Sequence, residues 1–436
     1  MLAAFVLAGS LALGQNQMQE PAPDKSPTAR DELKAGVKSQ VNKLIHKLDA
    51  DRKTTRDQAE DDLIKLGPGI LELLPTDQST ANLSADQLDR LTKIRQLLQH
   101  EQAEASFDGT TVTLKGKTTL AKALAALQAQ TGNRVEARQS EDEANDEFEL
   151  QFDKTPFFTA LETLCDRRKL TIYPYGLANA LQLRNRLPDE LPLTGRSVLS
   201  GPLRIEPTRV LASRDLRRAD EASLVVMLEV AWEPRLQPIA VKLLHNSIEA
   251  TDEQGQALAV HDPMAEKEAF GRGSVSAVTM EVPLRAPTTP VRKIGHLKGS
   301  IRAMLPGKME TFRFTNILKK GSQDIRIAAA KVTLEEVRKN SDTWEFAVHV
   351  AFDDAGDALD SHRNWILQNP ACLEGPDRKP IPYDTMETTE RDKNGIGLSY
   401  QFAMKELPAQ AVFVYKTPVM IVTKDFPWEL KDIRLP

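Results

Sequence analysis

The densest group of acidic side chains lies between residues 353 and 360, and it is the first place to look for chemistry. The group consists of Asp353, Asp354, Asp357 and Asp360, in a predicted loop after a predicted strand. Calcium binds several carboxylate oxygens, so these residues are a candidate calcium site. The ligand spacing and the glycine of an EF-hand are absent, although Gly356 lies nearby. We therefore favour a solvated loop over a metal site.

A second acidic run could face a basic partner. It contains Glu141, Asp142, Glu143, Asp146 and Glu147. Runs of like charge are usually solvated, so we interpret it as a surface connection and keep the basic partner as the alternative.

The tripeptide Gly116-Lys117-Thr118 stands between a predicted strand and a predicted helix, where a phosphate-binding loop would place it. The complete motif needs a glycine five positions before Gly116, because backbone N–H groups must wrap the phosphates. That position is Thr111, inside the strand. We predict an ordinary strand-to-helix turn and no nucleotide cofactor.

The seven histidines are scattered and form no H-E-x-x-H or His-x-His pair. His349 falls on the outward face of a predicted strand, and His362 lies beside Asp360 and Arg363 in a predicted surface loop. The serine signatures G-x-S-x-G and S-x-x-K are also missing. We assign no catalytic residue and favour a protein that is not an enzyme.

The elements that carry these residues fall into four regions, and the first, residues 33–104, is predicted to be helical. Apolar residues at three-and-four spacing run from Val37 to Leu48 and again from Ala59 to Leu66. A later helix is expected from about Ala85 to Gln102. The stretch LIHKLDADRKTTRDQAEDDLIKLGPGILELLP resembles one HEAT-type repeat, over one unit only.

Residues 106–186 contain an internal repeat of strand, helix and strand. The apolar positions Leu120, Ala123, Leu124 and Leu127 recur as Phe157, Ala160, Leu161 and Leu164, each 37 residues later (157 − 120 = 37). Two such units predict a small β-α-β-β-α-β domain, with both helices on one face of one sheet.

This region also resembles a known family. TTVTLKGKTTLAKALAALQAQTGNRV and FELQFDKTPFFTALETLCDRRKLTIYPY are similar to the short N-terminal domain of bacterial secretins and TonB-dependent receptors. The resemblance implies a protein-contact module of the cell envelope, without catalytic residues. No secretin gate or long series of outer-membrane strands follows, so the resemblance does not extend to a pore.

Residues 200–318 and 320–436 alternate apolar and polar side chains, as half-buried strands do. We predict two tandem antiparallel β-sandwiches. Short matches suggest that they are copies: Arg204-Ile205 with Arg326-Ile327, Val230-Ala231-Trp232 with Val350-Ala351-Phe352, and Phe314-Thr315-Asn316-Ile317 with Leu430-Lys431-Asp432-Ile433. The fold class is thus multi-domain α+β.

Aromatic and sulfur side chains are interpreted as core residues. Trp232, Phe314, Phe352 and Leu430 occupy alternating strand positions, which favours a sandwich core over a sugar-binding platform. Cys165 lies on an apolar helix stripe, and Cys372 falls in another predicted domain. We therefore expect two free thiols, with a disulfide as the alternative.

The first residues indicate export. Residues 1–14 have the apolar core and small residues of a signal peptide, and residues 15–32 read as a linker. No basic residue precedes the apolar run. The run is also shorter than the roughly 20 residues of a membrane span, so we expect no span after cleavage. A net charge of −5 without a basic tract disfavours nucleic acid as a partner.

Together these patterns predict a periplasmic or extracellular protein that binds an envelope or extracellular protein, as a non-catalytic binding or scaffold protein. Two alternatives remain open. One is a secreted hydrolase that uses carboxylates such as Asp353 or Asp360 between the sandwiches, and the other is an accessory subunit of a secretion or uptake complex.

Overall fold

The computed structural model describes residues 29–75, 83–137, 146–177, 179–217, 222–264, 266–270, 275–287, 290–353, 355–360 and 363–436. Among the described residues, strands account for 47% and helices for 23%, so the protein is mostly β and of the α+β class. The predicted signal peptide, most of the predicted linker, Glu141, Asp142, Glu143, Asp354 and His362 lie outside the described residues. The chain divides into a unit that ends at Arg95 and a unit from Gln96 to Pro436.

The first unit is helical where the apolar spacing predicts helices. Its elements are α1 (Ala29–Lys47), α2 (Lys53–Lys65), the 3-10 helix η1 (Pro68–Leu73) and the start of α3 (Ala85–Ser106). Val41, Leu48 and Leu63 are fully buried. Gly67, with a φ of 72°, ends α2 in a conformation that other residues adopt at a cost. None of the described helices is both long enough and apolar enough to cross a membrane.

The small α/β domain follows α3. Its elements are β1 (Thr111–Thr118), α4 (Leu120–Thr131), β2 (Val135–Ala137), β3 (Phe148–Pro156), α6 (Phe157–Arg168), β4 (Leu170–Leu177) and β5 (Ala180–Asn185). The eight repeated helix positions are all buried, as the 37-residue match predicts. The expected single sheet is wrong. β1 and β3 form a two-stranded sheet, and β2-β5-β4 form a separate three-stranded sheet that includes the unpredicted β5.

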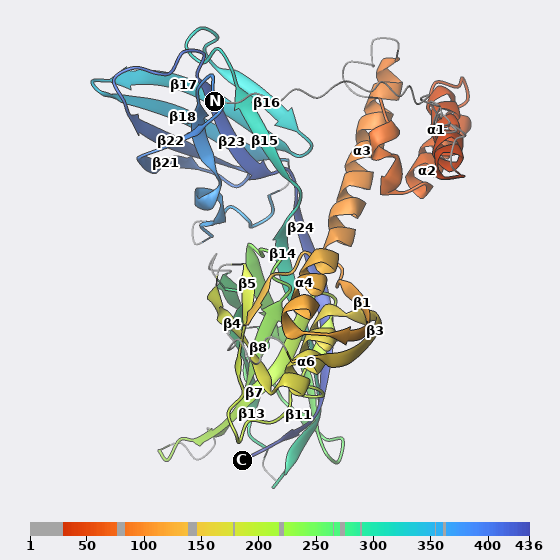
Figure 1. Cartoon of the computed structure of the whole chain (residues 1–436), viewed down its shortest axis with the longest axis vertical. Coiled ribbons are helices and arrows are strands. Elements are labelled where there is room, and N and C mark those ends of the chain that lie inside the picture. The colour runs from red at the N-terminus through yellow and green to blue at the C-terminus, as the bar shows by residue number, and fades with distance from the viewer. Residues whose placement is uncertain are drawn as a thin grey trace, which may run out of the picture. The chain divides into compact units, whose positions relative to one another are not determined.

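The first β region packs two sheets around one hydrophobic core (Figure 1). One sheet has the order β13-β8-β7-β6, with β6 (Val198–Ser200), β7 (Leu203–Arg214), β8 (Ala222–Trp232) and β13 (Ala277–Arg285). The other has the order β11-β10-β14-β9-β12, with β9 (Ala240–Leu244), β10 (Glu249–Asp252), β11 (Ala257–Leu258), β12 (Glu266–Phe270) and β14 (Lys293–Pro306). The 3-10 helix η3 (His245–Ser247) joins β9 to β10.

The second β region also encloses a core of its own between two sheets. One sheet has the order β16-β17-β18-β22-β21, with β16 (Gln323–Ile327), β17 (Ala330–Asn340), β18 (Thr343–Phe352), β21 (Thr385–Arg391) and β22 (Gly395–Ala403). The other has the order β15-β23-β19-β20, with β15 (Met309–Phe314), β19 (Ala371–Glu374), β20 (Pro380–Pro382) and β23 (Val412–Pro418). The 3-10 helix η4 (Trp365–Gln368) precedes β19.

The last strand leaves the second region and joins the first. β24 (Ile421–Arg434) pairs with β14 along its whole length, from Ile421 opposite Pro306 to Arg434 opposite Lys293. The expected boundary of 320–436 therefore does not match the strand pairing. The proposed match of Phe314 with Leu430 also pairs strands of different length and sheet, although both side chains are core residues.

The two β regions share a strand order, which agrees in part with the duplication. β6-β7-β8-β13 in the first region corresponds to β16-β17-β18-β22 in the second. Trp232 and its proposed counterpart Phe352 are 352 − 232 = 120 residues apart. The residues that pair with them in the neighbouring strands, Leu203 and Ala330, are 330 − 203 = 127 residues apart. The match of Arg204 with Arg326 at 122 is therefore not a structural equivalence, because Arg326 lies in the preceding strand.

Candidate functional site

The outward face of the β13-β8-β7 sheet carries the residues of greatest functional interest. Successive side chains of a strand point to opposite faces, and the inward set fills the core. The outward set forms five rows across β7, β8 and β13. They are Arg204–Ala231–Ala277, Glu206–Glu229–Thr279, Arg209–Met227–Glu281, Leu211–Val225–Pro283 and Ser213–Ser223–Arg285.

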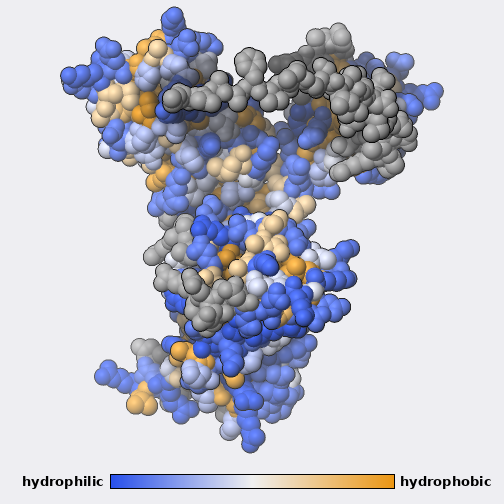
Figure 2. All heavy atoms as spheres, viewed as in Figure 1, coloured by the Kyte–Doolittle hydropathy of each residue, from blue (hydrophilic) through white to orange (hydrophobic). Residues whose placement is uncertain are grey.

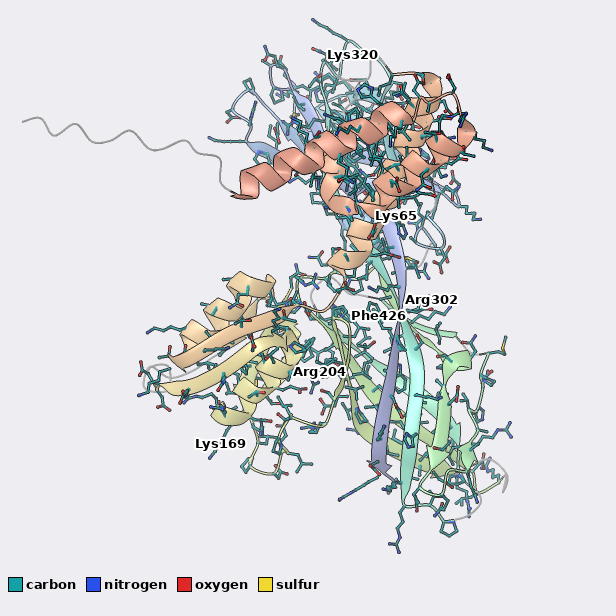
Figure 3. All side chains as sticks on the ribbon, turned by 90° about the vertical axis from the view of Figure 1, so that its right-hand side faces the viewer. Lys65, Lys169, Arg204, Arg302, Lys320 and Phe426 are labelled. Carbon is teal, nitrogen blue, oxygen red and sulfur yellow. The ribbon has the colours of Figure 1, made fainter. Side chains whose placement is uncertain are left out.

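The small α/β domain packs against the first two rows, although Thr279 at the end of the second row stays exposed. Ala231 and Ala277 are each 1% exposed and belong to the same core as α4 and α6. Figure 3 shows Arg204 between the small domain and the strands of the first β region. Two of the five rows of this sheet face therefore belong to a domain interface.

A buried ionic cluster holds this interface. The Arg204 guanidinium lies 2.7 Å from Glu162 of α6, 2.6 Å from Glu206 and 3.7 Å from Glu229. The Arg204 side chain is 1% exposed, and Arg196 makes a further ion pair with Glu206. Burial alone would lower the pKa of Arg204, but the adjacent carboxylates outweigh it and raise that pKa. The guanidinium therefore stays charged and joins α6 to β7 and β8.

The cluster holds one more negative charge than positive charges, because three carboxylates face two arginines. Burial raises the pKa of Glu229 above its usual value of 4.5, against the opposing effects of Arg204 and of the Tyr175 hydroxyl. Burial likewise raises the pKa of Tyr175 to about 12. The interface therefore disfavours the charged form of Glu229.

Replacing Glu229 with glutamine should therefore stabilise the protein at pH 7. A raised folded-state pKa means that the folded protein binds the proton more readily, so the wild type loses stability as pH rises from the unfolded pKa through the folded pKa. Glutamine does not titrate. Chemical denaturation should show E229Q more stable at pH 7, with the difference vanishing below about pH 4, where Glu229 is protonated in both states. A variant less stable at pH 7 would contradict the charge assignment.

A second buried junction is centred on Glu233, just after β8. Its carboxylate accepts hydrogen bonds from Thr110 N at 2.7 Å, Thr110 Oγ1 at 2.9 Å, Asn133 Nδ2 at 3.0 Å and Arg235 Nε at 2.7 Å. Arg235 also donates to the backbone carbonyls of Ser106 and Asp108. Glu233 therefore connects the start of β1 and the end of α4 to the first β region.

The remaining rows are not covered by the small domain. Leu211 is 47% exposed, and Val225, Met227 and Pro283 are partly exposed. Arg209, on the same face, is exposed as well. Figure 2 shows apolar residues among hydrophilic ones at the lower left, where β7 and β8 extend outward in Figure 1. This part of the sheet face therefore presents an apolar row beside charged side chains.

The three described candidate calcium residues, Asp353, Asp357 and Asp360, each contact an arginine. Asp353 forms an ion pair with Arg326, and Asp357 lies 2.8 Å from Arg363. The hydrogen bond from Arg363 lowers the pKa of Asp357. The backbone carbonyl of Asp360 accepts from Arg391 at 2.9 Å. In the parts of the chain that the structure describes, no three His, Cys, Asp or Glu residues are placed to hold a metal ion.

The other sequence candidates take structural positions. Gly116, Lys117 and Thr118 lie within β1 and pair with β3, so they form no phosphate loop. His349 lies on the face of β18 opposite its buried residues, as predicted. Cys165 and Cys372 are both free thiols, which confirms the favoured interpretation.

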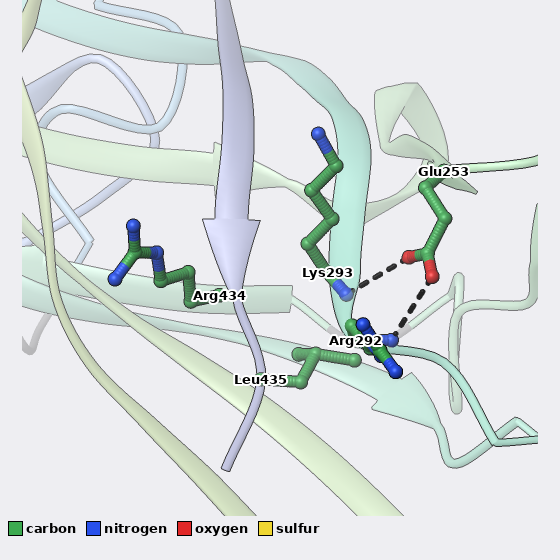
Figure 4. Close-up of a pocket in the computed structure, with 5 residues that line it drawn as sticks. All are labelled: Glu253, Arg292, Lys293, Arg434 and Leu435. Carbon is green, nitrogen blue, oxygen red and sulfur yellow. Dashed lines mark hydrogen bonds between the residues drawn. The ribbon is translucent and has the colours of Figure 1, made fainter.

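A shallow pocket of about 370 Å³ lies where β14 begins and β24 ends. The Glu253 carboxylate there accepts from the backbone N–H groups of Lys293 at 2.9 Å and Arg292 at 3.2 Å, as Figure 4 shows. These hydrogen bonds lower the pKa of Glu253. With Arg434 the lining carries three cations and one carboxylate, a net charge of 3 − 1 = +2. It contains neither Asp353 nor Asp360, the carboxylates of the hydrolase alternative.

No family model, no curated protein and no solved structure matches this chain. The candidate site is therefore defined by its geometry alone.

Sequence reasoning missed the ionic cluster and the Glu233 junction. One signal was available: Glu229 is the single charged residue in the run from Leu224 to Trp232, LVVMLEVAW. A lone charge within such a strand needs a partner when it is buried. The positions of Glu162 and Arg196 had no comparable signal, since their contacts depend on tertiary packing.

Proposed function

We propose that this chain is an exported, non-catalytic binding protein of the cell envelope that acts through protein–protein contacts. The observation that carries the proposal is the partly covered face of the β13-β8-β7 sheet. The small domain occupies its first two rows, and the row of Leu211, Val225 and Pro283 remains open beside exposed charges.

The proposed architecture is a helical region, a secretin-like short domain and two tandem sandwiches, with β24 returning to the first. The resemblance of residues 106–186 to the short domain of secretins and TonB-dependent receptors supports a role in envelope contacts. Two buried junctions, at Arg204 and Glu233, support a scaffold in which that domain has a set orientation on the first sandwich. An accessory role in a secretion or uptake complex is a narrower form of this proposal.

Site-specific photo-crosslinking tests the contact role. A photoreactive amino acid at Leu211 should give a discrete adduct with another envelope protein in cells that express the full chain. The same group at Thr388, exposed on β21, is the matched control and should not give that adduct. The substitution V225D should reduce the Leu211 adduct at least tenfold, because it places a charge in the apolar row. Absence of an adduct, or one unaffected by V225D, would overturn the proposal.

A further inference from the structure

Strand β7 has an unpaired edge over its second half. β6 pairs only with Leu203, Arg204 and Ile205, so the strand from Pro207 to Arg214 has no neighbour on that side among the described residues. A β-bulge separates Pro207 from Arg209, and Thr208 to Arg214 are exposed except for the partly buried Val210. A proline and a bulge are common ways to blunt a strand edge, but here both lie at the start of the unpaired stretch, before Val210 to Arg214.

The register shows which backbone groups point outward. Trp232 N donates to Ser276 O on the β13 side, whereas Glu233 N donates to Pro202 O on the β7 side. Hydrogen-bonding direction alternates along an antiparallel strand, so the odd-numbered residues of β8 bond to β7. Their partners beyond the bulge are Arg209, Leu211 and Ser213, which leaves the N–H and C=O groups of Val210, Ala212 and Arg214 directed to the open edge.

The charges at this edge are positive. Arg209 and Arg214 are exposed and form no ion pair among the described residues, while Glu206, the nearest carboxylate of β7, is occupied by Arg204 and Arg196. Arg209 and Leu211 point to the outward face of the sheet, whereas Arg214 points to the opposite face. An added strand would therefore meet outward backbone groups, one apolar row and two cations, one on each face of the sheet.

We propose that the edge Val210–Arg214 binds an extended segment of a partner protein that carries acidic side chains, which adds to the sheet as a further strand beside β7. This inference rests on the proposed function and specifies how the partner binds. Charge decides the occupant. A second copy of the chain, paired antiparallel about Leu211, would bring four arginines into one two-stranded ribbon that carries no carboxylate. An acidic segment would instead place carboxylates beside the arginines of this edge.

Short fluorescent peptides that alternate glutamate with valine, and matched lysine–valine peptides, are suitable probes for the full chain. The acidic peptide should bind the wild type and the lysine peptide should not. The substitution A212P removes an outward N–H without touching the β7–β8 ladder, and proline is tolerated on an edge strand. It should weaken acidic-peptide binding at least tenfold, whereas A212V, which keeps the N–H, should not.

The double variant R209E/R214E keeps the test valid if A212P does not fold, and it should reverse the peptide preference. Equal binding of both peptides, no binding of either, or full binding by A212P would overturn strand addition. A dimer in sedimentation that A212P dissociates would also overturn it, in favour of a second copy. A Leu211 adduct that depends on Val225 but is unchanged in A212P would leave the proposed function standing and reject this binding mode alone.

Discussion

Replacing Arg204 with methionine should lower the free energy of unfolding by about 3–5 kcal/mol at pH 7, the usual cost of removing one partner from a buried ion pair. Methionine fills much of the space of arginine but leaves the carboxylates of Glu162, Glu206 and Glu229 close together, with only Arg196 to oppose them. The decrease in the free energy of unfolding should become smaller as pH falls, because protonation removes the repulsion among the three carboxylates. Urea denaturation at pH 7 and at about pH 4 measures both effects.

Arg302 provides the matched control for Arg204. It pairs with Asp425 at 2.7 Å, but both side chains are nearly half exposed, and Figure 3 shows Arg302 on β14. Water can solvate the partner that remains, so R302M should cost about 0–1 kcal/mol. Equal losses for R204M and R302M would mean that the buried cluster does not hold the interface.

Local sequence patterns predicted the helices but not the sheets. Leu120, Leu124 and Leu127 are buried because one face of a helix is set by spacing along the chain, and spacing is visible in the sequence. The pairing of β24 with β14 joins residues 293–306 to residues 421–434, and no local pattern encodes such a distant partner. Alternation therefore identified the strands without assigning them to sheets.

The candidate site shows the same division at the level of single residues. Alternation correctly places Val226, Leu228 and Val230 in the core. It also makes Val225 and Leu211 outward residues, but it cannot say which outward residues a second domain covers. That depends on where the small domain rests, and hence on contacts such as Arg204 with Glu162 that span 42 residues.

Replacing Glu233 with alanine should lower the free energy of unfolding by about 3–5 kcal/mol. Glu233 is 1% exposed, and its carboxylate accepts from two groups of Thr110, from Asn133 and from Arg235. Each buried donor left without a partner costs about 1–3 kcal/mol, reduced where water enters the space. The small domain should also separate more readily from the sheet, so trypsin should cut faster at Arg186 and Arg196, in the segment between β5 and β6.

Glu253 is the control that distinguishes the effect of burial from the effect of losing hydrogen bonds. It also accepts two backbone hydrogen bonds, from Arg292 and Lys293, but it lies at the surface, where water can replace it. E253A should therefore leave the denaturation midpoint and the tryptic cleavage rate close to those of the wild type. If E233A and E253A behave alike, the Glu233 junction does not orient the small domain. If only E233A also weakens the Leu211 adduct, the contact surface depends on the orientation of the small domain. That result would support the proposed scaffold role, because one buried carboxylate would then hold the domain in place.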